Sequence, residues 1–302
     1  MAFTPTNVNY AAEYSKALAN AYPYLSYFPE IWAAENSRLY KPGLGKTMYI
    51  PTLTTSGARA ADRDQVTGTF NRNWNNTFTP VTLEMDREWD TLVDPMDMEE
   101  SGAVATIANI TKAFNEQQKV PEMDAYLASK LYSFVTPDTQ SLTVSNLLGK
   151  WDQWLEAMTN AHASLDRVVA YFDPQTYSYL KQAGGMSRYF NVTEQEGRGE
   201  NGYDIIRMMA SIDGVKIRVV PGDIMKSAFT FTDGWAVASG AKQIHAIMLD
   251  VDSVAAPVKY ETSMISEPNA QSKGKYLYYE RYYYGAFKLD ARGGAIVVSA
   301  AA

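Results

Sequence analysis

The sequence predicts an α+β protein, and two observations support that prediction. Apolar residues recur at helical spacing along 95–135 and again within 143–183, whereas from residue 212 onward the chain consists of short strand-like stretches separated by Gly-containing turns. The composition, 46% hydrophobic with 20% charged residues, is that of a globular protein. At 302 residues, the chain is long enough for one large domain or two intertwined domains.

The first part of the chain combines a helical arm with a projecting loop. Residues 10–39 are expected to be mostly helical, with interruptions at Pro23 and Pro29. In residues 46–92, the strand-like stretches "KTMYIPTL" and "TPVTLEMDREW" flank a long polar segment without helical periodicity. A polar loop of this length is unusual inside a compact domain, so we expect an extended β-hairpin that projects onto a partner.

Two helical regions follow the hairpin. A long helix over 95–135 has one apolar stripe and is expected to kink or restart at Pro121. Residues 143–183 predict a helix, a short strand and a second helix that begins with Asp173 as its N-cap. Residues 184–204 are expected to form a loop, with "EQEGRGENG" as its most mobile part.

The composition excludes several classes of protein. Cysteine is absent, so neither disulfides nor thiolate chemistry is possible. The two histidines, His162 and His245, stand apart from each other and are expected to be structural. The net charge of −7 argues against general polyanion binding. We expect no signal peptide and no membrane span, because no stretch approaches the ~18 consecutive apolar residues that a span requires.

Sequence motifs for nucleotide binding and hydrolysis are missing. "KPGLGKT" has Tyr40 where a P-loop requires its first Gly, and no helix is expected after it. Neither a G-x-S-x-G nor a G-x-G-x-x-G pattern occurs. These motifs therefore identify no catalytic residue and no bound cofactor, and we expect no enzyme activity and no metal ligand set.

The stretch "MDREWDTLVDPMDMEESGAV" (85–104) is unusually acidic. Four carboxylates alternate with other residues and would share one face of a strand: Glu84, Asp86, Glu88 and Asp90. Such a face repels itself unless solvent, a metal ion or cations neutralise it. A second group surrounds the start of the following helix: Asp94, Asp97, Glu99 and Glu100. Asp94 reads as the N-cap of that helix, whose dipole favours each first-turn carboxylate by about 0.3–1 kcal/mol.

Three explanations for the acidic strand remain open. A calcium loop would need a Gly that residues 84–100 lack, although another metal site stays possible. A hydrolase could use two of the carboxylates as acid and base. The hypothesis we favour is charge pairing between subunits, because the polar loop contains Arg59, Arg63 and Arg72. Their expected partners are carboxylates from both acidic groups: Glu84, Asp86, Glu88, Asp97, Glu99 and Glu100.

The order of these features resembles that of the major capsid proteins of tailed bacteriophages with the Hong Kong 97-type fold. The resemblance covers most of the chain in element order. It is most specific at "DPMDMEESGAVATIANITKAFNEQQKVPEMDAYLASKLYS", where an acidic start leads into the long helix. The stretches "DRVVAYFDPQTYSYLKQA" and "YYERYYYGAFKLDARGGAIVV" also follow in the order of that family.

The resemblance implies a division of the chain into named parts. These are an N-arm (1–45), an E-loop hairpin with flanking strands (46–92), a P-domain spine helix (93–139), an A domain (140–255), P-domain return strands (256–285) and a C-terminal A-domain strand (286–302). In the family the E-loop reaches over a neighbouring subunit. Some members form a cross-link through an E-loop Lys, but residues 50–111 contain no Lys, so this chemistry is not expected here.

The function that the resemblance implies is structural. Copies of the chain would assemble into pentamers and hexamers of an icosahedral phage head that encloses double-stranded DNA without reading its sequence. A separate scaffolding protein and a portal would be partners, no membrane would be involved, and the virion would assemble in the cytoplasm of a bacterial host. Two alternatives remain: an encapsulin-like nanocompartment shell, and a carboxylate-based hydrolase that uses residues 84–100.

Overall fold

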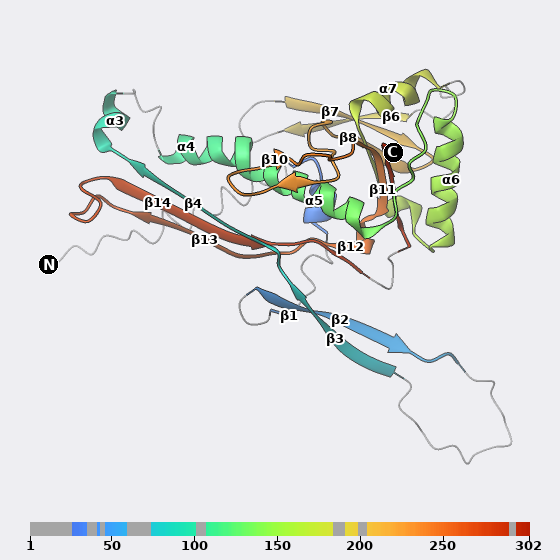
Figure 1. The fold of residues 1–302 in the computed structure, drawn as a ribbon, viewed down its shortest axis with the longest axis horizontal. Coiled ribbons are helices and arrows are strands. Elements are labelled where there is room, and N and C mark those ends of the chain that lie inside the picture. The colour runs from blue at the N-terminus through green and yellow to red at the C-terminus, as the bar shows by residue number, and fades with distance from the viewer. Residues whose placement is uncertain are drawn as a thin grey trace, which may run out of the picture.

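The computed structural model describes residues 26–34, 41–42, 46–58, 74–100, 107–183, 191–198, 204–289 and 294–302. The described part contains two principal sheets, one long helix that lies against both, and a narrow ribbon of strands that projects from the body (Figure 1). The predicted α+β class is confirmed.

The long helix runs from Ile107 to Phe134 in three parts. These are α4 (Ile107–Phe114), a π-helical turn (Asn115–Lys119) and α5 (Val120–Phe134). Pro121 has no N–H to donate to the carbonyl four residues before it. The π turn lies directly before this position, and its wider hydrogen-bond spacing accommodates the proline. The helix therefore continues past Pro121 instead of breaking. A shorter helix, α3 (Pro95–Glu100), precedes it, and residues 101–106 lie outside the described part.

A six-stranded sheet forms one half of the body. Its strands are, in spatial order, β16 (Ile296–Ala300), β11 (Ile244–Asp250), β5 (Val168–Phe172), β8 (Val215–Val219), β7 (Asp204–Ile212) and β6 (Asn191–Arg198). Strands β5 and β8 are parallel, and every other neighbouring pair is antiparallel. Helices α6 (Leu147–Asn160) and α7 (Pro174–Gln182) cover one face of this sheet, and α5 and α2 (Pro29–Trp32) cover the other.

This double cover explains why every residue of β5 is buried. Val168, Ala170 and Phe172 pack into a core with the tryptophans of α6. Val169 and Tyr171, which point to the opposite face, pack into a second core with α2 and α5. The predicted N-cap of α7 is confirmed, because the Asp173 carboxylate accepts a bond of 2.7 Å from the Thr176 N–H.

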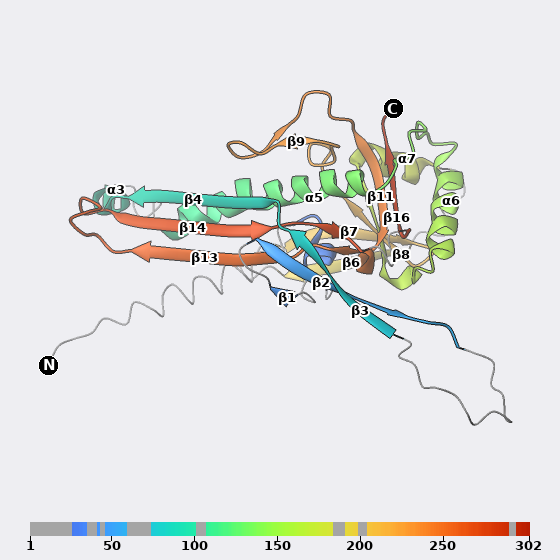
Figure 2. The same ribbon diagram turned by 60° about the horizontal axis from the view of Figure 1, so that its bottom comes forward.

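A three-stranded antiparallel sheet forms the other half, in the order β13 (Val258–Ser266), β14 (Tyr276–Tyr284) and β4 (Met85–Val93). The long helix lies along one face of it (Figure 2). At this interface Trp89 stacks on Phe114 with ring centroids 4.1 Å apart, and Tyr126 meets Tyr284 edge to face at 5.2 Å.

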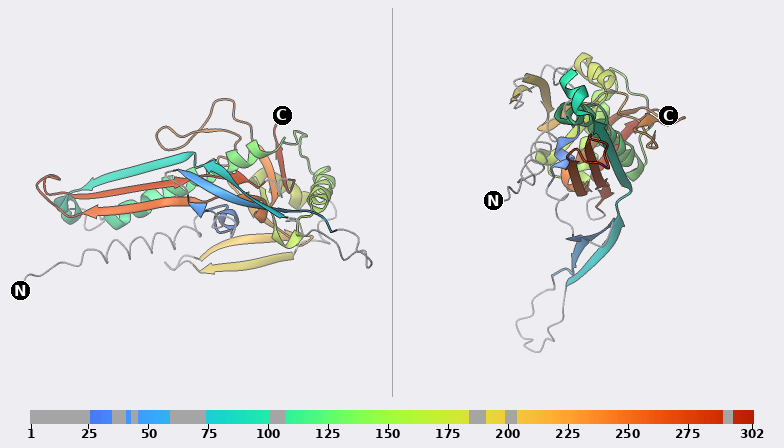
Figure 3. Two further views of the ribbon diagram at one scale, coloured as in Figure 1. Left: turned by 90° about the horizontal axis from the view of Figure 1, so that it is seen from below. Right: turned by 90° about the vertical axis from the view of Figure 1, so that its left-hand side faces the viewer.

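The predicted projecting hairpin is confirmed as the ribbon of β2 (Thr47–Thr55) and β3 (Trp74–Thr82), with β1 (Lys41–Pro42) added beside β2. Figure 3 shows the ribbon leaving the body at the end of the three-stranded sheet. One expectation needs correction, because "TPVTLEMDREW" is not one strand. Strand β3 ends at Thr82, and after Leu83 and Glu84 the chain enters β4 in a different sheet.

Short elements complete the described part. They are β9 (Phe229–Thr230), β10 (Ala236–Val237), β12 (Val254–Ala255), β15 (Phe287–Lys288) and two 3₁₀ turns, Leu165–Arg167 and Val251–Ser253. In the described section of the predicted N-terminal arm, only α2 is helical, and Pro29 is its first residue rather than a break. No described helix combines the length and apolar character needed to cross a membrane.

The expected loop over 184–204 is wrong in its middle. Residues 191–198 form β6, which pairs along its whole length with β7. The stretch contains Gly, Gln and Glu, and no alternation of apolar residues identifies it as a strand. Backbone hydrogen bonds to β7 satisfy its peptide groups regardless of side-chain type, so tertiary pairing decides this segment.

Candidate functional site

Strand β4 places three of the four predicted carboxylates on one face, as the alternation indicates, and the fourth, Glu84, lies just before the strand. Glu84, Asp86, Glu88 and Asp90 are called the acidic face below. Of the residues between them, Arg87 and Trp89 point to the long helix and are partly buried, and Val93 at the end of the strand is buried. Glu88 and Asp90 are exposed. Within β4, Asp86, Glu88 and Asp90 therefore lie on the side of the three-stranded sheet that faces away from the helix, whereas Glu84 lies before the strand and contacts the helix.

Glu84 lies at the bend between the ribbon and β4, and it has partners on the long helix. Its carboxylate pairs with Lys130 at 2.5 Å, and the Tyr126 hydroxyl donates to it at 3.3 Å. Burial, followed by the nearby Glu84 charge, raises the pKa of Tyr126 well above its usual value, so the phenol stays protonated and keeps donating.

Asp86 binds two cations. Arg281 of β14 makes a two-point contact with its carboxylate, at 3.1 Å from Nε and 2.9 Å from Nη2, and Lys46 binds it at 2.8 Å. The ring of Tyr283 lies beneath both cations, 5.5 Å from Lys46 Nζ and 5.3 Å from the Arg281 guanidinium. The hydrogen bond from Arg281 is the largest reason why the pKa of Asp86 lies below its usual value.

The rest of the acidic face has no cation within the described chain. Glu88 accepts a bond of 3.2 Å from the Tyr279 hydroxyl. Asp90 is exposed opposite Tyr279 in the strand register, and no ion pair with a described residue reaches it. Two of the four carboxylates are thus neutralised inside the subunit, and Glu88 and Asp90 are the pair that remains open to solvent or to another chain.

The second acidic group surrounds α3. The Asp94 carboxylate accepts a bond of 3.0 Å from the Met96 N–H, which agrees with its predicted capping role, and it lies 3.7 Å from Lys275. Asp97 is exposed in the first turn. Glu99 and Glu100 belong to the last turn of α3, and their side chains lie outside what the structure describes.

The predicted cationic partners Arg59, Arg63 and Arg72 fall in the segment 59–73, outside the described residues. Their pairing with the carboxylates of a neighbouring subunit stays a prediction. The structure adds that Arg281, Lys46 and Lys130 of the same chain already occupy Asp86 and Glu84, a solution that the sequence alone did not indicate because these residues lie far apart along it.

The ribbon has an apolar face that the sequence analysis missed. In the register of β2 and β3, residues directly opposite each other share a face, which places Pro51 with Phe78 and Thr55 with Trp74. Leu53, Phe78 and Trp74 are 69%, 48% and 51% exposed on this face. The other face is polar, with Thr52 and Thr77 hydroxyls 2.8 Å apart. The signal was the even spacing of these residues, because Pro51 and Leu53 lie two positions apart in β2 and Trp74 and Phe78 lie four positions apart in β3.

On the helix side, the three-stranded sheet meets a row of polar groups. Arg87 binds Glu122 of α5, which also accepts a bond of 3.0 Å from the Tyr284 hydroxyl. One turn earlier, buried Lys119 forms an ion pair with buried Glu280. The amide of buried Asn115, within the π turn, has no hydrogen-bond partner at either of its polar atoms among the described residues. Charge pairs and hydrogen bonds therefore add to the aromatic packing at this interface.

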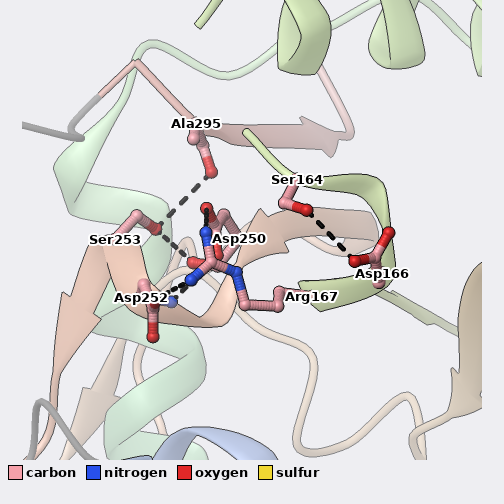
Figure 4. A network of polar contacts seen from close by, with 7 residues as sticks. All are labelled: Ser164, Asp166, Arg167, Asp250, Asp252, Ser253 and Ala295. Carbon is pink, nitrogen blue, oxygen red and sulfur yellow. Dashed lines mark hydrogen bonds and ion pairs between the residues drawn. The ribbon is translucent and has the colours of Figure 1, made fainter. Parts of the chain in front are cut away.

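A polar network also holds the place where the chain leaves the six-stranded sheet (Figure 4). Asp250 ends β11, and its carboxylate accepts a bond of 3.0 Å from the Asp252 N–H. Arg167 pairs with Asp252 and lies 3.9 Å from Asp250. The Ser253 hydroxyl donates to the Asp250 carbonyl at 2.6 Å. These bonds fix the turn through which the chain passes from one sheet to the other.

Among the described residues, neither histidine belongs to a catalytic or metal-binding arrangement of side chains. His245 Nδ1 lies 3.3 Å from the Asp173 carboxylate, the same group that caps α7. His162 occupies a turn after α6 with a positive φ of 57°. No group of three or more His, Asp or Glu side chains in the described ranges is arranged to hold a metal ion.

Comparison with solved structures gives the fold its name. No known protein-family profile and no curated sequence matches this chain. The capsid of the cyanophage P-SCSP1u superimposes with a TM-score of 0.59 at 11% identity, over 87% of this chain and 85% of that chain. The capsid of Helicobacter pylori bacteriophage KHP30 gives 0.55 at 12% identity, over 92% and 90%. This is the Hong Kong 97-type capsid fold.

A third structure with the Hong Kong 97-type fold, the mature capsid of bacteriophage PhiM1, gives a TM-score of 0.54 at 12% identity over 84% of this chain and 82% of that chain. The predicted fold is thereby confirmed. At identities of 11–12% the likeness establishes the architecture alone, and the role of each residue has to come from the geometry described above.

Proposed function

We propose that this protein is a major capsid protein, a structural subunit whose copies assemble into the shell of a tailed-phage head. The observation behind this proposal is the shared architecture with three phage capsids over more than four fifths of both chains. In this role the chain contributes contacts between copies and performs no catalysis. Its location would be the virion.

The finer parts of the proposal follow the parts of the fold. The ribbon and its flanking strands (46–92) reach a neighbouring copy, and the spine helix (93–139) and return strands (256–285) form the P domain. The six-stranded sheet belongs to the A domain (140–255, with 286–302), and residues 1–45 form the N-arm. Contacts between unlike surfaces of adjacent copies close into rings of five and six.

The apolar face of the ribbon supports this assembly role. Leu53, Phe78 and Trp74 are each about half exposed or more, on strands that project from the body. Large apolar side chains gathered on a projecting surface mark a site for contact with another protein. In a shell, the neighbouring copy would cover them. Double-stranded DNA would be enclosed without sequence-specific contacts, and a scaffolding protein and a portal would act as further partners.

Electron microscopy of the purified full-length protein, combined with analytical ultracentrifugation, tests the proposal. Closed isometric shells with five- and six-fold capsomers are the expected result. Shells that consistently enclose a protein cargo would favour a nanocompartment instead. A stable monomer that hydrolyses glycosides, and loses this activity when Glu88 is changed to Gln, would overturn the shell proposal in favour of a carboxylate-based hydrolase.

A further inference from the structure

The base of the ribbon contains a compact cluster of charged and aromatic side chains. Its members, called the ribbon-base cluster below, are Lys46, Asp86, Arg281 and Tyr283. Lys46 directly precedes β2, whereas Asp86 and Arg281 belong to β4 and β14 of the three-stranded sheet. The cluster therefore joins one leg of the ribbon to the body.

The two legs of the ribbon are tied to each other at the same level. The Leu83 N–H, at the end of the returning leg, donates to the Lys46 carbonyl at 2.9 Å. Lys259 of β13 donates to the Thr47 carbonyl at 3.4 Å. Met48 and Leu83 are both 1% exposed, so each leg also has a buried apolar anchor. Beyond these anchors the described strands of the ribbon are mostly exposed.

Gly285 allows Leu83 to reach its buried position. A Cβ at residue 285 would lie 3.0 Å from the Leu83 Cδ2 atom and 3.4 Å from its Cα. Leu83 thus packs closely against the residue that follows β14, and a Cβ at position 285 would require the Leu83 or Phe287 side chain to shift by a few tenths of an ångström.

We propose that Asp86 is the positioning residue of the ribbon: it fixes the direction in which the ribbon projects by binding Arg281 of the sheet and Lys46 of the ribbon at the same time. The two-point contact with Arg281 orients the carboxylate. The remaining attraction acts on Lys46, whose main chain is bonded to the opposite leg through Leu83. Tyr283 supports both cations from below.

The role assigned to Asp86 is orientation rather than folding. The side chains of Lys46, Arg281 and Asp86 are 41%, 36% and 21% exposed, and pairs that are this accessible contribute little to global stability. These ion pairs nevertheless affect where the ribbon points, because a small rotation at its base causes a large displacement of its far end. The orienting role of Asp86 does not depend on the proposed function. The effect of that role on assembly does rest on the proposed function.

The lack of native cysteine makes a direct test possible. Nitroxide labels at Thr55→Cys, on the ribbon, and Gln271→Cys, in the turn between β13 and β14, report the distance between ribbon and body by pulsed electron resonance. The full-length labelled protein is diluted into an excess of unlabelled protein, so that only distances within one chain are recorded. The wild-type cluster is expected to give one narrow distance distribution.

Asp86→Asn is expected to broaden that distribution by roughly twofold, because the amide cannot hold both cations. Glu88→Gln is the matched control, since Glu88 lies two residues away on the same face and has no cationic partner in the described chain. If Asp86→Asn impairs folding, Lys46→Met tests the same contact from an exposed position. A distribution as narrow as wild type in a folded variant of either kind would overturn the proposal.

The outcome can be separated from that of the proposed function. Chains that never form shells but show the broadening would support the positioning role and contradict the capsid role. If the protein forms normal shells and the distance distribution of Asp86→Asn stays narrow, the capsid role is supported and the positioning role is contradicted.

Discussion

Arg87 and Glu122 form a two-point ion pair between the three-stranded sheet and the long helix, with Nε to Oε1 at 2.7 Å and Nη2 to Oε2 at 2.9 Å. The same guanidinium donates to the Phe231 carbonyl at 2.7 Å. Arg87 thus connects three parts of the fold: β4, α5 and the segment that contains β9. Because the Glu122 side chain is only 5% exposed, removing its cation would leave a charge in a place that water hardly reaches.

Replacing Arg87 with Met is therefore expected to lower the free energy of unfolding by about 3 kcal/mol. Urea denaturation followed by circular dichroism measures this change. Lys112→Met is the control, because it breaks an exposed pair with Glu116 on the same helix and should cost only about 0.3–0.5 kcal/mol. Equal effects of the two substitutions would show that the interface does not depend on Arg87.

Replacing Asn115 should raise the free energy of unfolding instead of lowering it. Within the described part of the chain, neither polar atom of its buried amide has a hydrogen-bond partner, and leaving both unpaired costs free energy that an apolar side chain of similar size would not cost. Asn115→Leu is expected to raise the free energy of unfolding by about 1–2 kcal/mol. Gln117→Leu, on the exposed side of the same π turn, should change it by less than about 0.5 kcal/mol. A loss of stability in Asn115→Leu would mean that the amide is needed where it lies.

Acid should weaken the ribbon-base cluster only below the usual pKa of an aspartate. The hydrogen bond from Arg281 holds the pKa of Asp86 below its usual value, so its contribution to stability is complete above that usual value. The contribution is lost as the pH falls through the lowered pKa, below about pH 4. The stability difference between wild type and Asp86→Asn, at most about 1 kcal/mol because the groups are partly exposed, should stay constant from pH 7 to about 4.5 and then shrink. A difference that shrinks between pH 7 and 5 would contradict this assignment.

The apolar face of the ribbon should matter for assembly and not for folding. The double substitution Leu53→Ser and Phe78→Ser is expected to leave the thermal midpoint of the isolated subunit nearly unchanged, since both side chains are already exposed. Association should weaken by about tenfold for each 1.4 kcal/mol of lost contact. Light scattering during assembly measures this loss, and Thr54→Ser, on the other face, serves as control. Normal assembly of the double variant would show that another surface makes the contact.

The sequence predicts best what depends on neighbouring residues. The order α6, β5, α7 and the cap at Asp173 follow from local periodicity and local hydrogen bonding, and the structure confirms them. The alternation of the acidic face is local in the same sense. What the sequence cannot show is which residues meet across a sheet, and Arg281 lies 195 positions from Asp86.

The two wrong predictions from the sequence, the loop over 184–204 and the single strand "TPVTLEMDREW", also depend on contacts between distant segments. Strand β6 has no apolar alternation and is a strand only because β7 lies beside it. The bend at Leu83 and Glu84, which divides one expected strand between two sheets, depends on burial of Leu83 beside Gly285. Both features are decided by contacts between segments that are distant in sequence, where propensity and pattern give no information.

The central claim is that this chain is a shell subunit whose ribbon reaches a neighbouring copy. Electron cryomicroscopy of particles assembled from the full-length protein tests it most directly. The account predicts a closed icosahedral shell in which another copy covers Leu53, Phe78 and Trp74, while Asp86 still binds Lys46 and Arg281 of its own chain. Particles in which the ribbon contacts only its own subunit, or a protein that forms no closed shell under any assembly condition, would contradict it.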